Sequence, residues 1–302
     1  MKIQYIRFKI YLSVLFGIFS LFIMACSVST SAFTGDSDPQ LVGDALPFTI
    51  KLTEFLLDSS PKDRDLMLMN GSLLIMYSNA FVQGPAEMLP PEEWQARDEA
   101  MMRAKQLYLR GNNILEKALD SKYKNFTKNM QDGDFSILKK CKKKDTGFLY
   151  WAVAGGLAAY SIDVLDFDLS AKLPGWGAML QRAYEIDPDY SGTSLDELLF
   201  LYYASLPEIM GGDREKALSH FRRAQEKTGG NAAGAYVSYA QAICVPGQDY
   251  NTYKEYLEKA IAIDPDADIS IRLVTVIAQR KAHWLLDNAW VYFSFLPIPD
   301  DY

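Results

Sequence analysis

The chain has 302 residues, with 31 basic and 38 acidic side chains and a formal net charge of −7. An acidic body repels nucleic acid phosphates and anionic lipid headgroups, so the net charge argues against both as partners. Hydrophobic residues make up 49% of the sequence, which is enough to build one elongated domain or two compact ones.

The first 25 residues have the features of a bacterial secretory signal peptide. A head with three basic residues precedes an almost wholly apolar run over residues 10–24, and the small residue Ala25 precedes Cys26. The apolar run is shorter than the roughly 20 residues that a spanning helix needs. A cysteine at this place is typical of a lipoprotein signal. We therefore predict that residues 1–25 are a lipoprotein signal peptide and that Cys26 is lipidated; a plain signal anchor is the alternative.

Removal of residues 1–25 leaves 28 basic and 38 acidic residues, a net charge of −10. We expect residues 26–39 to form a flexible tether from the lipidated cysteine. The body would then lie in the periplasm, anchored to the cell membrane. Ser27 mildly favours the outer membrane, but the sequence leaves the choice between inner and outer membrane open.

Residues 40–289 show helical periodicity, and strand signals are nearly absent. We expect the helix that begins at residue 65 to end at Gly84-Pro85, because residues 82–91 cannot be helical throughout. The predicted helices, in chain order, are 40–58, 65–81, 92–119, 148–160, 176–186, 195–205, 213–228, 232–242, one beginning at 249, and 269–288.

Three of these segments repeat one pattern, in which an aromatic or leucine precedes an alanine and a proline or glycine follows. The alanines are Ala183, Ala224 and Ala260, spaced by 41 and 36 residues instead of the ~34 of a regular tetratricopeptide array. The sequence therefore predicts an all-α, tetratricopeptide-like solenoid of helical hairpins with long inter-helix insertions, such as residues 161–175. In the 148–160 helix, Gly155-Gly156 indicates close helix packing, since each glycine costs a free helix about 1 kcal/mol.

Residues that carry chemistry are sparse, and we predict no catalytic residue, metal or cofactor. His220 and His283 stand apart from any cluster, and a zinc site has no ligands at the usual spacing. Asp163, Asp166 and Asp168 resemble a calcium loop but lack its glycine and its bidentate glutamate. A solvated loop explains them better.

The two cysteines of the mature body leave questions open. Cys141 lies within a run of five lysines, which would favour a thiolate, although a solvated positive turn is the simpler interpretation. Pairing of Cys141 with Cys244 is possible in an oxidising compartment, but two cysteines do not make a disulfide framework.

Two groups of side chains are candidates for ligand or partner binding. The first lies at one helix end, where residues four apart share a face: Tyr77, Asn79, Phe81 and Gln83. The second lies on the first helices of the repeats, which line the concave face of a solenoid: Tyr150, Trp151, Tyr202 and Tyr236. In both groups a role in the core or in capping is the alternative.

Several segments together resemble one family. Leu41-Val42-Gly43-Asp44, Tyr77-Ser78-Asn79-Ala80-Phe81-Val82-Gln83-Gly84-Pro85, Leu138-Lys139-Lys140-Cys141 and Leu149-Tyr150-Trp151-Ala152 are similar to the TatT proteins. These are tetratricopeptide lipoproteins associated with tripartite ATP-independent periplasmic (TRAP) transporters. The resemblance covers about residues 26–265. It implies a periplasmic, membrane-tethered homotrimer, a solute-binding protein as partner and hydrophobic ligands.

The apolar C-terminal tail, residues 290–302, has no counterpart in that resemblance. It would dock on its own last helix or on a neighbouring subunit.

On this basis we expect a non-enzymatic scaffold lipoprotein of a TRAP-type uptake system that binds the solute-binding protein and, through it or directly, a small hydrophobic ligand. The alternative is a general tetratricopeptide adaptor for envelope protein assembly. A glycan-processing enzyme would need a pair of carboxylates facing one cleft, and the sequence offers no distinctive pair.

Overall fold

A computed structural model describes residues 35–36 and 38–298, so the predicted signal peptide and the predicted lipidation site, Cys26, lie outside the described residues. The prediction of an all-α fold is confirmed: the described part of the chain contains helices and no strand. The α-helices are α3 (Pro39–Ser59), α4 (Arg64–Tyr77), α5 (Gly84–Glu87), α6 (Trp94–Lys122), α7 (Phe126–Gln131), α8 (Thr146–Ile162), α9 (Phe167–Ser170), α10 (Leu173–Ile186), α11 (Ser194–Ser205), α12 (Arg214–Thr228), α13 (Ala233–Tyr239), α14 (Tyr250–Ala262) and α15 (Arg272–Asp287).

Shorter helical pieces join these elements. Two are π-helices, η2 (Ser78–Gln83) and η7 (Ala240–Cys244). The others are 3₁₀ turns: η3 (Pro91–Glu93), η4 (Phe135–Lys140), η5 (Lys143–Asp145), η6 (Glu208–Met210), η8 (Ile269–Ile271) and η9 (Ala289–Val291).

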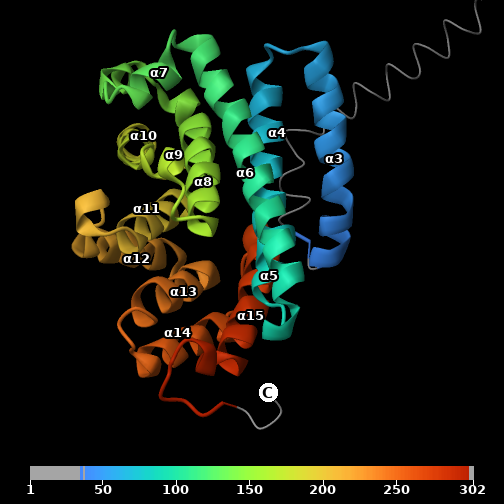
Figure 1. Cartoon of the computed structure of the whole chain (residues 1–302), viewed down its shortest axis with the longest axis vertical. Helices are drawn as coiled ribbons and strands as arrows, with labels where there is room; N and C mark the ends of the chain where they lie inside the picture. Colours follow the sequence, from blue (N-terminus) through green and yellow to red (C-terminus); the bar gives the residue numbers. More distant parts are fainter. Residues whose placement is uncertain (1–34, 37, 299–302) are drawn as a thin grey trace, which may run out of the picture.

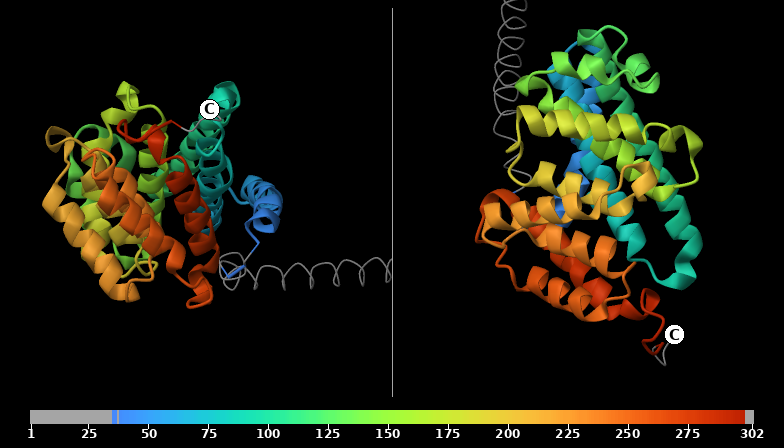
Figure 2. Two further views of the ribbon diagram at one scale, coloured as in Figure 1. Left: turned by 90° about the horizontal axis from the view of Figure 1, so that it is seen from below. Right: turned by 90° about the vertical axis from the view of Figure 1, so that its left-hand side faces the viewer.

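The long helix α6 is the axis of the molecule (Figure 1). Helices α4 and α8 both pack against it and also contact each other, and α3 packs on α4. Three helical pairs then follow along the chain, α8 with α10, α11 with α12 and α13 with α14, and α15 packs on the last of them (Figure 2). These are the hairpins expected from the repeated pattern, and Ala183, Ala224 and Ala260 are each fully buried in them.

Glycines allow α4, α6 and α8 to approach closely. A Cβ atom on Gly111 of α6 would lie 2.8 Å from the carbonyl oxygen of Gly71 in α4, and one on Gly155 of α8 would lie 2.8 Å from Ile75. Gly156, next in α8, faces the Trp176 ring of α10 so closely that a Cβ would overlap it. The sequence-based expectation of close packing at Gly155-Gly156 is therefore confirmed.

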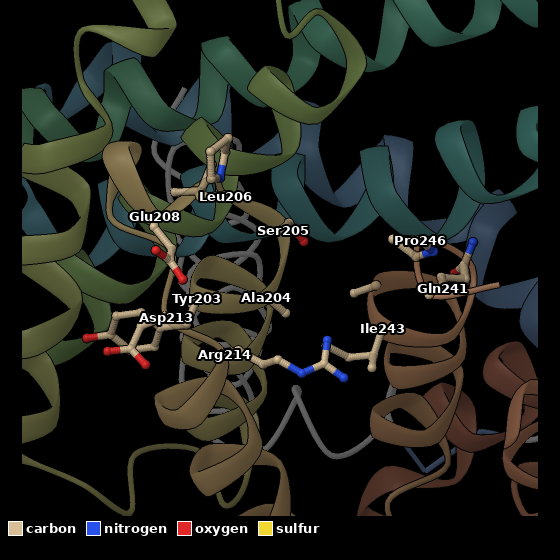
Figure 3. A pocket seen from close by; sticks show the side chains of 14 residues that line it. Tyr203, Ala204, Ser205, Leu206, Glu208, Asp213, Arg214, Gln241, Ile243 and Pro246 are labelled. Atoms are coloured by element: carbon tan, nitrogen blue, oxygen red, sulfur yellow. The ribbon is translucent and has the colours of Figure 1, made fainter. Parts of the chain in front are cut away.

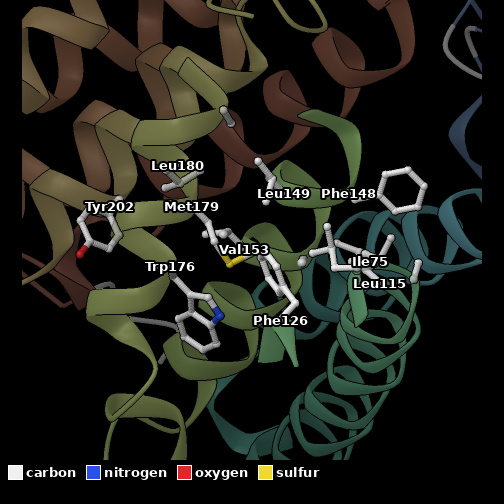
Figure 4. Packing of buried hydrophobic residues seen from close by; sticks show 14 of the residues in the cluster. Ile75, Leu115, Phe126, Phe148, Leu149, Val153, Trp176, Met179, Leu180 and Tyr202 are labelled. Atoms are coloured by element: carbon white, nitrogen blue, oxygen red, sulfur yellow. The ribbon is translucent and has the colours of Figure 1, made fainter. Parts of the chain in front are cut away.

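The main core lies around these contacts and continues from α6 through α8 and α10 to α11 (Figure 4). Leu149 and Val153 of α8 stand between Ile75 on one side and Met179 and Leu180 on the other, and all five are buried. Burial of each such side chain stabilises the fold by about 1.5–3 kcal/mol relative to exposure.

The prediction that the helix ends at Gly84-Pro85 is wrong. After Tyr77 the chain continues through η2 into α5, and the backbone N–H of Gly84 donates to the Asn79 carbonyl across one wide turn. Pro85 then falls in the first turn of α5, where a missing N–H removes no helical hydrogen bond. The insertion at 161–175 is likewise partly helical, because it contains α9 and the start of α10.

Both body cysteines are buried and free, so the possible disulfide between them is not formed. Burial, reinforced by the negative charge of Asp145, raises the pKa of Cys141 to about 11. This disfavours the thiolate. The alternative interpretation, a solvated positive turn, holds for the flanking lysines, which are exposed. It is wrong for the thiol of Cys141, which is buried.

Asp145 is the centre of a buried ionic network at the start of α8, and its side chain is fully buried. It accepts hydrogen bonds from Lys122 Nζ (2.5 and 2.7 Å), Tyr123 Oη (2.7 Å) and Arg64 Nη2 (3.2 Å). The network joins the ends of α4, α6 and η5. Because a buried charge without partners is expensive, these contacts fix the relative positions of the three elements.

The C-terminal tail docks on the hairpin of its own chain. Phe293 is fully buried, and its ring centroid lies 4.9 Å from Tyr253 and 5.3 Å from Tyr250, both on α14. Gln248 Nε2 also donates to the Tyr292 carbonyl (3.1 Å). The tail thus docks on its own chain, as the first of the two alternatives expected. It packs on α14 as well as beside the last helix, α15.

We predict that Gly156→Ala destabilises the fold by about 1–3 kcal/mol, because the added methyl group overpacks the contact with Trp176. Urea unfolding measures the effect. Gly234→Ala is the matched control: its Cβ would lie 3.4 Å from Glu197 Oε2, and we expect a change below about 1 kcal/mol. Equal losses in the two variants would contradict the proposed role of the α8–α10 contact.

We predict that Asp145→Asn destabilises the fold by about 3 kcal/mol, at the low end for a broken buried ion pair, because Lys122 and Arg64 retain some access to water. Asp163→Asn, at a carboxylate whose side chain is 41% exposed, should change stability by less than about 1 kcal/mol. If chemical denaturation ranked the two variants in the opposite order, the network would not have the role described.

The same network predicts a pH dependence. Burial raises the pKa of Asp145, but hydrogen bonds from Lys122, the Lys142 N–H, Tyr123 and Arg64 outweigh it and hold the pKa at about 2. The unfolded value is about 3.9. The depressed pKa stabilises the fold above about pH 5, and this stabilisation is lost as the pH falls through 4 towards 2. Denaturation midpoints across this range should fall less steeply in Asp145→Asn than in the unsubstituted chain.

Candidate functional site

The first group of predicted site residues lies where α4 passes through η2 into α5. The Tyr77 and Phe81 rings stack with centroids 6.1 Å apart, and both are partly buried. The Phe81 ring lies against Gly43 of α3, where a Cβ would be only 2.6 Å away. Asn79 is exposed on the outside of the same turn. The two aromatic rings therefore pack the N-terminal helices together, and Asn79 remains accessible.

Gln83 begins a chain of polar contacts that crosses the molecule. Its Oε1 accepts a hydrogen bond from Tyr108 Oη of α6 (2.7 Å), and its Nε2 donates to Glu87 Oε1 (2.8 Å). The other oxygen of Glu87 accepts from Lys281 Nζ of α15. Burial raises the pKa of Tyr108, so its hydroxyl remains a donor. The chain links α5, α6 and α15, three elements far apart in sequence.

The second group is divided between two environments. Tyr150 and Trp151 of α8 lie edge to face with centroids 5.0 Å apart, and Tyr190 approaches Tyr150 at 5.4 Å. Burial and the negative charge of Glu197 raise the pKa of Tyr150. Tyr236 of α13 is partly buried against the Tyr256 ring. These rings are partly buried, so only part of each is accessible to a ligand.

Tyr202 has a structural position instead. It is 5% exposed, and its hydroxyl donates to the Leu173 carbonyl (3.2 Å). The same oxygen lies 2.7 Å from where a Cβ on Gly211 would stand. Tyr202 therefore holds together the two loops that precede α10 and α12.

An open cleft of about 610 Å³ lies between the loop after α11 and the end of η7 (Figure 3). Tyr203, Leu206 and Arg214 line one side, and Gln241 and Ile243 line the other. Figure 3 shows the Arg214 side chain extending across the gap towards Ile243. Glu208 and Asp213 also line the cleft, so its walls combine one arginine and two carboxylates with apolar side chains.

The sequence analysis missed the residues of this cleft. Tyr203 was adjacent to a predicted residue, but Arg214 and Gln241 carried no local signal. They come together because successive hairpins place the ends of α11 and η7 at the same edge. Placing the ends of the predicted first helices of successive hairpins side by side would have identified this edge.

The two histidines lie in different surroundings. His220 Nδ1 lies 2.9 Å from Asp196 Oδ1, and the buried Asp196 carboxylate also accepts from Lys227 (2.8 Å) and Arg223 (3.2 Å). This cluster joins α11 to α12. His283 is exposed. Within residues 35–36 and 38–298, no group of three potential metal ligands is present, and no helix is both long and apolar enough to cross a bilayer.

Comparison with known proteins gives two matches. The family model described as TRAP transporter T-component (TAtT) matches residues 35–293. A protein of Treponema pallidum (strain Nichols), described as uncharacterized, is 35% identical over 268 residues, which cover 87% of this chain and 83% of that relative. The family match contains both π-helices, all the hairpins and the polar chain from Tyr108 to Lys281. The chain therefore belongs to the TAtT family of TRAP transporter T-components.

Proposed function

We propose that this chain is a non-enzymatic, lipid-anchored scaffold of a TRAP-type solute uptake system, located in the periplasm and built as a tetratricopeptide-like solenoid. Its role is to bind the solute-binding protein and keep it near the membrane. Family membership supports the association with the transporter. Cys26 supplies the anchor in this proposal, because it follows a signal-like leader.

The observation that carries the proposal is an exposed apolar edge. Among the described residues, the three most exposed large apolar side chains are Ile209 (96%), Phe167 (86%) and Leu165 (80%). Leu165 lies in the loop after α8, Phe167 begins α9, and Ile209 lies in η6 after α11. We name these three side chains the loop edge. Exposed large apolar side chains are commonly found at protein-binding sites.

The loop edge is held in a fixed shape before a partner binds. Lys105 Nζ donates to Asp163 and to Asp166 at 2.8 Å each, and Asp166 caps α9 by accepting from the Leu169 N–H. On the other loop, the Asp213 N–H donates to the Tyr203 carbonyl (3.0 Å). Because the backbone is already ordered, docking loses less conformational entropy. Two of the three aspartates that resemble a calcium loop, Asp163 and Asp166, thus support the loop edge.

The energetic advantage of the scaffold is effective concentration. A tether confines the bound partner near the permease, so that a weak interface is sufficient for repeated encounters. We extend the proposal to a homotrimer, and to a small hydrophobic ligand near the partly buried rings of Tyr150, Trp151 and Tyr236. Native mass spectrometry of the protein alone and mixed with the solute-binding protein encoded beside it reports all three: subunit number, retained ligand and partner.

We predict that Leu165→Ser/Phe167→Ser weakens association with that solute-binding protein by about tenfold or more, as expected when two exposed anchors of an interface are removed. Phe48→Ser/Phe55→Ser is the matched control. It changes two side chains on α3 that are 72% and 66% exposed, and it should leave the affinity within about threefold. Isothermal titration calorimetry measures both. No association of the unsubstituted protein at high micromolar concentration would count against the proposed function itself.

A further inference from the structure

The charges of the mature chain are strongly segregated. Residues 117–145 contain nine lysines and four aspartates, a net charge of +5. The rest of the chain after residue 25 contains 19 basic and 34 acidic residues, a net charge of −15. The overall charge of −10 therefore conceals one basic segment in an acidic body. A charge distribution of this kind sets which surface faces a charged partner.

The basic segment forms one end of the molecule. It comprises the last turns of α6, then α7, η4 and η5, which lie together at the top of Figure 1 and of the right-hand view in Figure 2. Tyr123 Oη donates to Asp145 (2.7 Å) and contacts the Lys140 carbonyl (3.2 Å), which ties these pieces together. We name the exposed lysines of this end the basic pole: Lys117, Lys124, Lys128, Lys139, Lys140, Lys142, Lys143 and Lys144.

An open cleft of about 760 Å³ lies within the basic pole. Three lysines line it, Lys122, Lys124 and Lys128, together with one carboxylate, Asp120, and with Ser121, Asn125, Thr127 and Gln131. Ammonium, hydroxyl and amide groups are donors for phosphate oxygens. The cleft therefore has the chemistry of a phosphate headgroup site, within a surface that attracts anions.

The acidic groups near the pole only partly neutralise it. Asp145 is buried and is paired with Lys122 and Arg64, and Asp132 pairs with Lys128 (2.5 Å). Asp120 binds the N–H and hydroxyl of Thr127. Lys143 pairs with Asp187 (3.1 Å), and the α3–α4 turn adds three aspartates against Lys62 and Arg64. Lys124, Lys139, Lys140, Lys142 and Lys144 form no ion pair within the described chain.

We propose that the basic pole lies against the membrane surface and binds anionic phospholipid headgroups, with one phosphate in the cleft of Lys122, Lys124 and Lys128. This inference rests on the lipid anchor of the proposed function. It also revises the expectation, drawn from net charge, that the body avoids anionic lipid. Each lysine near an anionic surface strengthens binding about fivefold at low ionic strength. A single acyl anchor is commonly supplemented by such a patch.

The dimensions of the chain allow this orientation. The 13 residues from Cys26 to Asp38 can extend about 45 Å. Helix α3 has 21 residues and is about 31 Å long. Its far end adjoins the basic pole, because Arg64 at the start of α4 donates to the Ala118 carbonyl (3.0 Å). A lipid on Cys26 can therefore reach the bilayer that the pole would face.

The test uses the mature chain with Cys26→Ser, which carries no acyl group. We expect it to sediment with vesicles of equal parts phosphatidylglycerol and phosphatidylcholine, but not with pure phosphatidylcholine vesicles. Salt should release it, because the Debye length falls from about 30 Å at 0.01 M to about 3 Å at 1 M. Lys124→Gln/Lys139→Gln/Lys140→Gln should weaken vesicle binding by about tenfold or more. Unchanged circular dichroism would show that the triple variant is folded.

Lys216→Gln/Lys254→Gln/Lys259→Gln is the matched control. It removes the same charge from exposed lysines of α12 and α14 and should bind anionic vesicles within about twofold of the unsubstituted chain. Equal loss in both variants, or no preference for anionic lipid, would overturn the inference and leave the anchor and the partner untouched. If the pole variant instead lost only the solute-binding protein, the pole would be a protein-binding surface and the membrane assignment would be wrong.

Discussion

The close approach of α4, α6 and α8 is the constraint on which the rest of the structure depends. At Gly111 the backbone of α6 lies against the Gly71 carbonyl of α4, and at Gly155 the backbone of α8 lies against Ile75. Any side chain at these points would push the helices apart and open the core on both sides of α6. Helix α6 has 29 residues and contacts both α4 and α8. These contacts therefore position both the N-terminal pair, α3 and α4, and the first hairpin, α8 and α10.

Polar contacts fix the positions of the elements that lie farther from this centre. The Asp145 network fixes the end of α6 against α4 and α8, and the chain from Tyr108 through Gln83 and Glu87 reaches Lys281 on α15. Buried polar groups demand specific partners, whereas apolar packing tolerates small shifts. The network and the chain therefore supply the specificity that hairpin stacking alone lacks.

The loop edge and the basic pole give the scaffold two distinct surfaces. Apolar side chains project from the loops after α8 and α11, and lysines gather where α6, α7 and η4 meet. Lys105 supports the loop edge through Asp163 and Asp166, and Asp145 supports the basic pole. In the function proposed above, one surface binds a partner and the other orients the scaffold on the membrane, and both need rigid support because relative movement would uncouple the two roles.

Sequence periodicity by itself determined the helical hairpins. Ala183, Ala224 and Ala260 each follow an aromatic residue or leucine and precede a proline or glycine at the same spacing. Close helix contact at these positions needs a small side chain whatever the rest of the fold is. The short motifs around Tyr77 and Tyr150 likewise indicate the family without any information on tertiary contacts. Such features are local in the chain, so the sequence alone is enough to find them.

Tertiary structure decided which side chains face each other. It buried Tyr202 and Cys141, continued the helix past Gly84-Pro85 through a π-turn, and placed Arg214 opposite Ile243. It also placed the lysine-rich segment, residues 117–145, at one end of a body that is otherwise acidic. These outcomes depend on residues that are distant in the chain and on the crossing of α6 with its neighbours, and no pattern within a single segment contains that information.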